Sequence, residues 1–131
     1  MKGFVEDIEE LTESNKNFRK VLYTGHHLQL VVMSIKKGSE IGEEVHEDRD
    51  QFFRIEKGKG EVLIDGETHK IRSGDAIIVP AGARHNVINT GNKALKVYTV
   101  YAPPEHLDGI VRKTKQEASE NEEHFDGKTT E

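Results

Sequence analysis

The sequence contains no cysteine and no tryptophan, and only 6% of its residues are aromatic. Without cysteine the chain cannot form a disulfide framework, a thiolate nucleophile, or a cysteine-ligated zinc or iron–sulfur site. Its longest apolar runs, such as residues 30–33 and 76–81, are too short to cross a bilayer. These absences predict a protein that uses neither disulfides nor a membrane anchor.

Acidic residues outnumber basic ones, 24 to 19, and the formal net charge is −5. An acidic chain without a basic stripe argues against nucleic acid and anionic membranes as partners. The first ten residues turn acidic at once, unlike a signal peptide. We therefore expect a cytoplasmic domain of 131 residues with a modest core, because only 34% of its residues are apolar. Such a domain often shares apolar surface with a second copy, so we expect a homodimer.

Short apolar stretches separated by turn residues dominate the middle of the chain. Asp65-Gly66 is a strong β-hairpin signal between two such stretches. The last strand, within residues 94–102, is stopped by Pro103 and Pro104. Strands at this spacing with glycine-rich turns predict an all-β sandwich or barrel.

Three segments are expected from the change in pattern along the chain. Residues 1–26 form a helix and strand that pack on the barrel, residues 27–107 form the barrel, and residues 108–131 form an acidic tail. Ile8 and Leu11 lie three apart among acids, as in a short amphipathic helix. In the tail, Thr114 and Glu117 have capping-box spacing. The tail is thus either a short helix or a solvated, partly disordered segment.

Two stretches carry residues suited to a metal site. In the first, Glu44 and His46 are two apart and share a face of a strand, as do Gln51 and Phe53 on the next strand. The second stretch, residues 74–89, contains glycine, proline, glycine, histidine and asparagine at fixed offsets. These residues are Gly74, Pro80, Gly82, His85 and Asn89.

The second stretch resembles the second motif of the cupin superfamily at every fixed position, and the resemblance extends over about half the chain. It implies a double-stranded β-helix, or jelly-roll, barrel. The first motif departs from the family pattern, which has two histidines and a glutamate. Here Gln51 stands at the glutamate position and Glu44 at that of the first histidine. The metal ligands that the resemblance implies are Glu44, His46, Gln51 and His85.

Two histidines and one carboxylate can hold a catalytic zinc or non-haem iron ion with open positions, while Gln51 offers a neutral oxygen. The expected cofactor is a divalent transition metal: zinc, manganese, iron or nickel. The alternative is a metal-free barrel in which Glu44 bonds to Gln51 and both histidines are satisfied in a polar core.

The reaction is not specified by the fold, because cupins host many activities. One hypothesis is a metal-dependent enzyme acting on a small polar substrate, either a dioxygenase or a sugar isomerase resembling phosphomannose isomerases. The other is a non-catalytic module that binds a metal or a small ligand. No catalytic residue outside the metal set is assigned.

Other residues are weaker candidates. Arg84 either anchors an anionic substrate at the barrel mouth or is an ordinary exposed arginine, and Arg54 is expected to face outward. Phe52 and Phe53 point to opposite faces, and an outward Phe52 beside Ile41 indicates either a subunit interface or a small core under the N-terminal segment. Residues expected to line the barrel are Gln29, Met33, Phe53, Ile55, Val87, Val97 and Tyr101.

Overall fold

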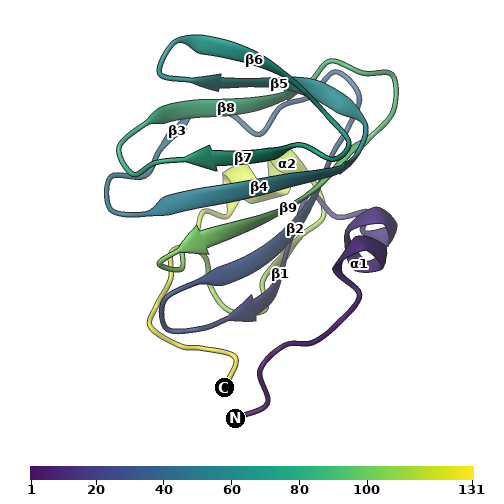
Figure 1. The fold of residues 1–131 in the computed structure, drawn as a ribbon. Coiled ribbons are helices and arrows are strands. Elements are labelled where there is room, and N and C mark those ends of the chain that lie inside the picture. Colours follow the sequence, from purple (N-terminus) through teal and green to yellow (C-terminus); the bar gives the residue numbers. More distant parts are fainter.

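Two antiparallel β-sheets make up most of the protein in a computed structural model that describes all residues from 1 to 131. One sheet has six strands in the order β10-β1-β2-β9-β4-β7, and the other has four in the order β3-β8-β5-β6. They form the walls of the expected all-β barrel (Figure 1). The elements are α1 (Ile8–Ser14), β1 (Arg19–Thr24), β2 (Gln29–Ile35), β3 (Glu44–Val45), β4 (Asp50–Lys57), β5 (Lys59–Ile64), β6 (Glu67–Arg72), β7 (Ala76–Val79), β8 (Arg84–Asn89), β9 (Leu95–Ala102), β10 (Val111–Arg112) and α2 (Lys115–Glu120).

The core lies between the two sheets and is built by strands whose residues alternate between buried and solvent-facing positions. Along β9 every second residue is buried, and β4 and β8 show the same alternation. All seven residues expected to line the barrel are at most 1% exposed, which confirms the parity argument. Every second side chain of these strands is therefore delivered to the barrel interior, where the site is built.

The hairpin turn and the helix cap expected from the sequence are both present. Asp65 and Gly66 both have positive φ values, 46° and 84°, as the two central residues of a tight hairpin between β5 and β6 require. The side chain of Thr114 accepts a hydrogen bond of 3.0 Å from the backbone N–H of Glu117 and caps α2. The C-terminal segment thus contains a short helix.

Both terminal segments are attached to the barrel. β1 pairs with β2, and β10 pairs with β1 at the edge of the six-stranded sheet. The carboxylate of Glu131 accepts hydrogen bonds from the backbone of Lys2 and Gly3 and from the hydroxyl of Tyr23, so the two ends of the chain lie together (Figure 1). No helix has the length and apolar character needed to cross a membrane.

The outer face of the six-stranded sheet carries apolar side chains. Phe53 points into the core, whereas Phe52 faces outward with its ring 6.2 Å from that of Tyr98. Ile78, which pairs with Phe52 across β4 and β7, is 69% exposed. Ile41 does not lie beside Phe52 as expected; it packs against the core instead. The outward patch therefore consists of Phe52, Ile78 and Tyr98.

We expect this patch to be covered in a homodimer, because exposed apolar clusters mark association surfaces. Sedimentation at micromolar concentration should give twice the chain mass. Ile78→Glu should shift the protein to monomer, whereas Glu61→Ala on the other sheet should not. A monomeric wild-type protein would contradict the prediction.

Candidate metal centre

Strand pairing brings the four candidate ligands to one end of the barrel interior. Glu44 on β3 lies directly across from His85 on β8 in the four-stranded sheet. Gln51 on β4 lies in the opposite sheet, paired with Tyr101 on β9. His46 follows β3 and its ring centre is 5.5 Å from that of His85. The two sequence motifs, far apart along the chain, therefore meet in space.

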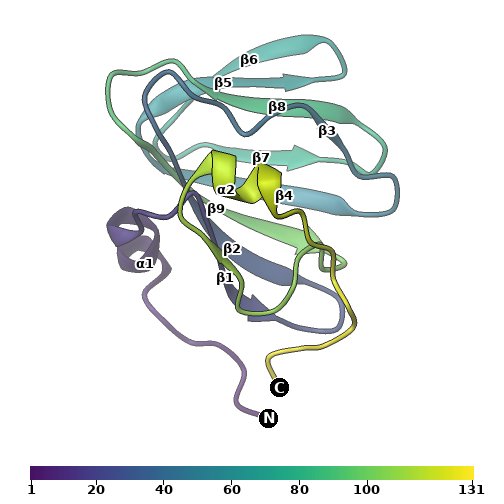
Figure 2. The same ribbon diagram turned by 180° about the vertical axis from the view of Figure 1, so that it is seen from behind.

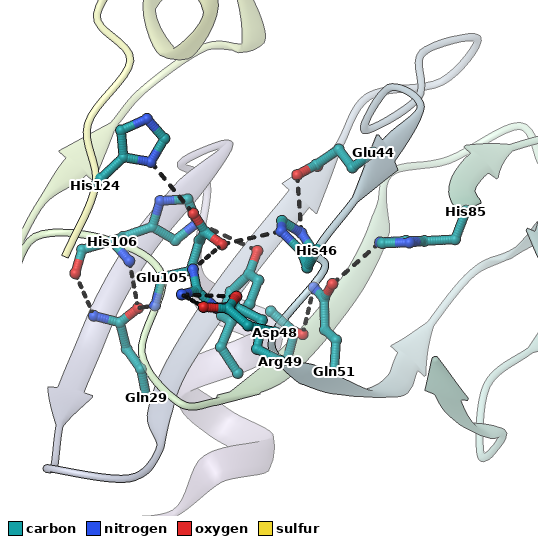
Figure 3. A network of polar contacts seen from close by, with 12 residues as sticks. Gln29, Glu44, His46, Asp48, Arg49, Gln51, His85, Glu105, His106 and His124 are labelled. Carbon is teal, nitrogen blue, oxygen red and sulfur yellow. Dashed lines mark hydrogen bonds and ion pairs between the residues drawn. The ribbon is translucent and has the colours of Figure 1, made fainter. Parts of the chain in front are cut away.

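His85 has an oxygen atom beside each ring nitrogen, and Figure 3 shows the contact with Gln51. Its Nδ1 lies 3.1 Å from the carbonyl oxygen of Ala83, and its Nε2 lies 3.2 Å from Oε1 of Gln51. The Nε2 of Gln51 donates to Oγ1 of Thr99 at 3.0 Å, which leaves the amide oxygen facing His85. A neutral imidazole has one N–H, so it can satisfy only one of these two acceptors. With the proton on Nδ1, Nε2 presents a free lone pair.

His46 has the same orientation, with Nδ1 held by an oxygen and Nε2 turned toward the other ligands (Figure 3). Nδ1 lies 3.0 Å from Oε2 of Glu105, and Nε2 lies 3.1 Å from Oε2 of Glu44. The second contact is an ion pair without hydrogen-bond alignment, so Nε2 is a buried nitrogen with no hydrogen-bond partner. Such a nitrogen can bind a metal ion once it has lost its proton.

Glu105 organises the surroundings of His46 and was not found from the sequence. It is 7% exposed, pairs with Arg49 at 2.5 Å, and donates its backbone N–H to Oε1 of Gln29. Arg49 lies in the turn before β4 and its guanidinium reaches this carboxylate. The signal in the sequence was a glutamate and a histidine, Glu105 and His106, directly after the prolines that end β9.

Electrostatics hold His46 as a cation when no metal is bound. Burial lowers its pKa, but the contacts with Glu105 and Glu44 outweigh burial and raise it to about 9. Burial raises the pKa of Glu105, yet His46 and Arg49 bring it down to about 2. The pKa of Glu44 is also lowered, because its pairing with His46 outweighs burial. The metal-free site is thus an imidazolium between two carboxylates.

The stability of the metal-free protein should fall as the pH rises from 6.5 to about 9. The folded-state pKa of His46 lies above its ordinary value of 6.5, so the stabilisation is complete below pH 6.5 and is lost as the pH passes about 9. We expect the free energy of unfolding, measured by urea titration, to drop by about 2 kcal/mol across this range. His46→Gln should remove most of the drop; an unchanged drop in that variant would contradict the assignment.

The donor set fits a divalent metal ion. Carboxylate, imidazole and amide oxygen are common ligands of zinc, manganese, iron and nickel. Two ligand atoms at right angles, each about 2.1 Å from a metal, are about 3.0 Å apart. The Glu44–His46 and Gln51–His85 contacts, at 3.1 Å and 3.2 Å, are close to that spacing. Both imidazoles also have an oxygen at Nδ1, which in metal sites fixes the ring and its tautomer.

In this structure, however, the donors are satisfied in pairs. No three His, Cys, Asp or Glu side chains gather into a cluster that could hold a metal ion. Glu44 contacts His46, and Gln51 contacts His85, so the expected metal-free contact between Glu44 and Gln51 does not form. Metal binding would exchange these two pair contacts for ligand bonds.

The remaining candidates lie outside the site. Arg84 pairs with Glu43 at 2.6 Å and both are exposed, so Arg84 is an ordinary surface arginine. Arg54 lies on the outward face beside Glu56. Exposed histidines away from the site are His26, His27 and His69, whereas the exposed His124 has its Nδ1 3.5 Å from Oε1 of Glu105.

A cavity of about 340 Å³ reaches the ligand Glu44 from the surface. Its walls come from β1, from the segment before β3, and from α2 with the residues after it. In Figure 2, α2 lies across the opening between the two sheets, where it forms the outer wall. Glu44 retains 30% of its side-chain exposure, so solvent reaches this candidate ligand through the cavity.

Comparison with known proteins agrees with the geometry. A family model described as Cupin domain matches residues 31–101, more than half of the chain. The chain belongs to the cupin family. The two-sheet barrel described above is therefore the fold of that family.

Individual cupins resemble the chain to different degrees. The protein YrkC of Bacillus subtilis is 46% identical over 123 residues, which cover 89% of this chain and 66% of YrkC, so the chain spans just under two thirds of that relative. The crystal structure of BH2720 from Bacillus halodurans is 44% identical, with a TM-score of 0.90 over 92% of this chain and 96% of BH2720. Quercetin 2,3-dioxygenase of Bacillus subtilis is 30% identical over 89 residues, 67% of this chain and 26% of that enzyme.

Proposed function

We propose that this cupin binds one divalent transition metal through Glu44, His46, Gln51 and His85 and is a metal-dependent enzyme acting on a small polar substrate. The observation that carries the proposal is the orientation of both imidazoles. Each has Nδ1 beside an oxygen and Nε2 turned toward the other candidate ligands. Two independent segments, the Ala83 carbonyl and the Glu105 carboxylate, hold the rings in this way.

A bound metal would supply Lewis-acid or oxygen-binding chemistry at positions not taken by protein ligands. Glu44 would provide the negative charge, and Glu105 would hold a proton on Nδ1 of His46. The Ala83 carbonyl would hold a proton on Nδ1 of His85. Substrate would enter through the cavity beside Glu44, with α2 limiting its size and excluding bulk water.

Dioxygenase-type chemistry is the first sub-class we propose. A two-histidine, one-carboxylate set with open positions suits oxygen chemistry, and a relative of this chain is a quercetin 2,3-dioxygenase. Sugar isomerisation is the second sub-class. The set Glu44, His46, Gln51 and His85 resembles the Gln, His, Glu, His zinc site of phosphomannose isomerases, with glutamine and glutamate exchanged. Phosphorylated sugars are disfavoured, since neither Arg54 nor Arg84 faces the site.

A non-catalytic role as a metal- or ligand-binding module is the alternative. It is favoured because two groups close to the candidate ligands are poor bases: Glu105 is held by His46 and Arg49, and burial raises the pKa of Tyr101 so that its hydroxyl stays protonated. The solvent path to Glu44 argues the other way, because a purely structural site would be closed.

Elemental analysis of the purified protein, followed by an oxygen-uptake screen with the metal found, tests the proposal. We expect about one transition metal per chain. A preparation that lacks metal and also rejects added manganese, iron, nickel and zinc would rule the site out. A loaded protein that neither consumes oxygen nor interconverts sugars would favour the non-catalytic module.

A further inference from the structure

A buried arginine lines the same cavity. Arg19 stands on β1 two residues before Val21, so both side chains point to the inner side of the sheet. It is only 9% exposed, and its guanidinium carbon lies 5.4 Å from the ring centre of Phe18. Arg19, Phe18 and Glu44 all belong to the wall of the 340 Å³ cavity. The cation is therefore inside the protein and beside the open space that leads to the metal ligands.

The guanidinium of Arg19 forms no hydrogen bond and no ion pair within the protein. Its Nε is buried and makes no hydrogen bond, and none of the ion pairs in the structure includes it. Burying a charge without pairing it is costly, and for this reason buried arginines are almost always bound to carboxylates. The neighbouring ring of Phe18 supplies only a weak attraction. The five N–H donors of Arg19 form a fork that suits an anion from outside the chain.

The acidic residues around the cavity do not supply this anion, because they are already committed. Five glutamates line it, and the one without a cation partner, Glu122, is exposed at the rim. The other four are ion-paired: Glu43 with Arg84, Glu44 with His46, Glu105 with Arg49, and Glu123 with Arg112. Arg19 contributes through space to the lowered pKa of Glu44 and of Glu123, but it forms an ion pair with neither.

We propose that Arg19 binds the carboxylate of a small organic acid that occupies this cavity, and that the substrate or ligand of the protein is therefore a carboxylate. The role of this carboxylate as a substrate at the metal rests on the proposed function, whereas its binding in the cavity depends only on Arg19. A single guanidinium matches a planar monoanion in a two-bonded arrangement. A phosphate dianion would need more cations and would be repelled by the glutamates around the cavity.

Binding measurements on the full chain test this class of ligand. Acetate, pyruvate and succinate are the carboxylate probes, pyruvamide is the neutral counterpart of pyruvate, and inorganic phosphate is the competing anion. Titration calorimetry is run on metal-free and manganese-treated protein. We expect millimolar or tighter binding of at least one carboxylate, at least about tenfold weaker in Arg19→Met and within about twofold of wild type in Arg84→Met.

Several outcomes would overturn the proposal. These are absence of saturable binding by all three carboxylates, equal binding of pyruvamide and pyruvate, tighter binding of phosphate, or unchanged carboxylate binding in Arg19→Met. Carboxylate binding that depends on Arg19 in a protein that rejects every metal would refute the proposed function but support the anion site. Metal uptake together with carboxylate binding that does not depend on Arg19 would support the proposed metal site and refute the anion site.

A second measurement separates a ligand-binding arginine from a structural one. Removing an unpaired buried charge relieves a cost, so Arg19→Met without ligand should have an unfolding temperature equal to or above that of wild type. Arg49→Met, which breaks a buried ion pair with Glu105, should lower that temperature by roughly 5 °C or more. A comparable fall in Arg19→Met would show that Arg19 serves the fold and would overturn the proposal.

Discussion

Replacing His85 with alanine is expected to abolish tight metal binding. His85 is 4% exposed, and its ring is fixed between the Ala83 carbonyl and Gln51 so that Nε2 is the atom available to a metal. Loss of an outer partner of a ligand already weakens metal binding about 10- to 100-fold, so loss of the ligand itself should exceed that range. Elemental analysis and manganese titration of the variant measure the effect.

His69→Ala is the matched control, because the His69 side chain is 53% exposed and its ion-pair contact is with Glu67, away from the candidate ligands. It should keep the wild-type metal content. His46→Ala should behave as His85→Ala does, whereas Gln51→Ala should only weaken binding, since a neutral amide oxygen is a poor ligand. Equal loss in all three variants would show that Gln51 is a full ligand. Full metal content in His85→Ala would refute the site.

Glu105→Gln is expected to have the second largest effect, on stability as well as on metal affinity. Glu105 is the shared anion of Arg49 and His46, and it is almost completely buried. Removing its charge leaves two cations beside a neutral amide, which should lower the free energy of unfolding by about 3 kcal/mol. The proton on Nδ1 of His46 also loses its carboxylate, so metal affinity should fall about 10- to 100-fold.

Urea unfolding and metal titration measure these two effects. Glu43→Gln provides the comparison, because the Glu43–Arg84 pair is exposed and such pairs contribute less than about 1 kcal/mol. If Glu105→Gln were as stable as Glu43→Gln and bound metal as tightly as wild type, Glu105 would not be the residue that organises the site.

The metal candidates could be found from the sequence because three of them stand on regular strands with motif spacing and His46 directly follows β3. Side chains alternate along a strand, so His85 and Val87, or Gln51 and Phe53, are assigned to one face by counting. Glu105, which contacts His46, and Arg49, which contacts Glu105, were not found, because both lie in irregular segments, where counting gives no direction. Their roles follow from a 2.5 Å contact between positions 56 residues apart.

Arg19 illustrates the same limit in a strand. Its parity with Val21 could have placed it inside, but an arginine is ordinarily a surface residue, and the sequence does not reveal that no carboxylate reaches it. The cavity beside Arg19 is formed only when α2 packs across it. The sequence of α2 has almost no apolar stripe and so does not predict that packing.

The sequence by itself determined the barrel, its turns, and the four residues that face one another within it, because strand periodicity and turn chemistry are local properties. Tertiary structure decided how those residues are paired, which carboxylate supports His46, and which arginine remains without a partner. These pairings form between side chains from distant segments in an interior of low dielectric. They are therefore fixed only once the two sheets and α2 have packed.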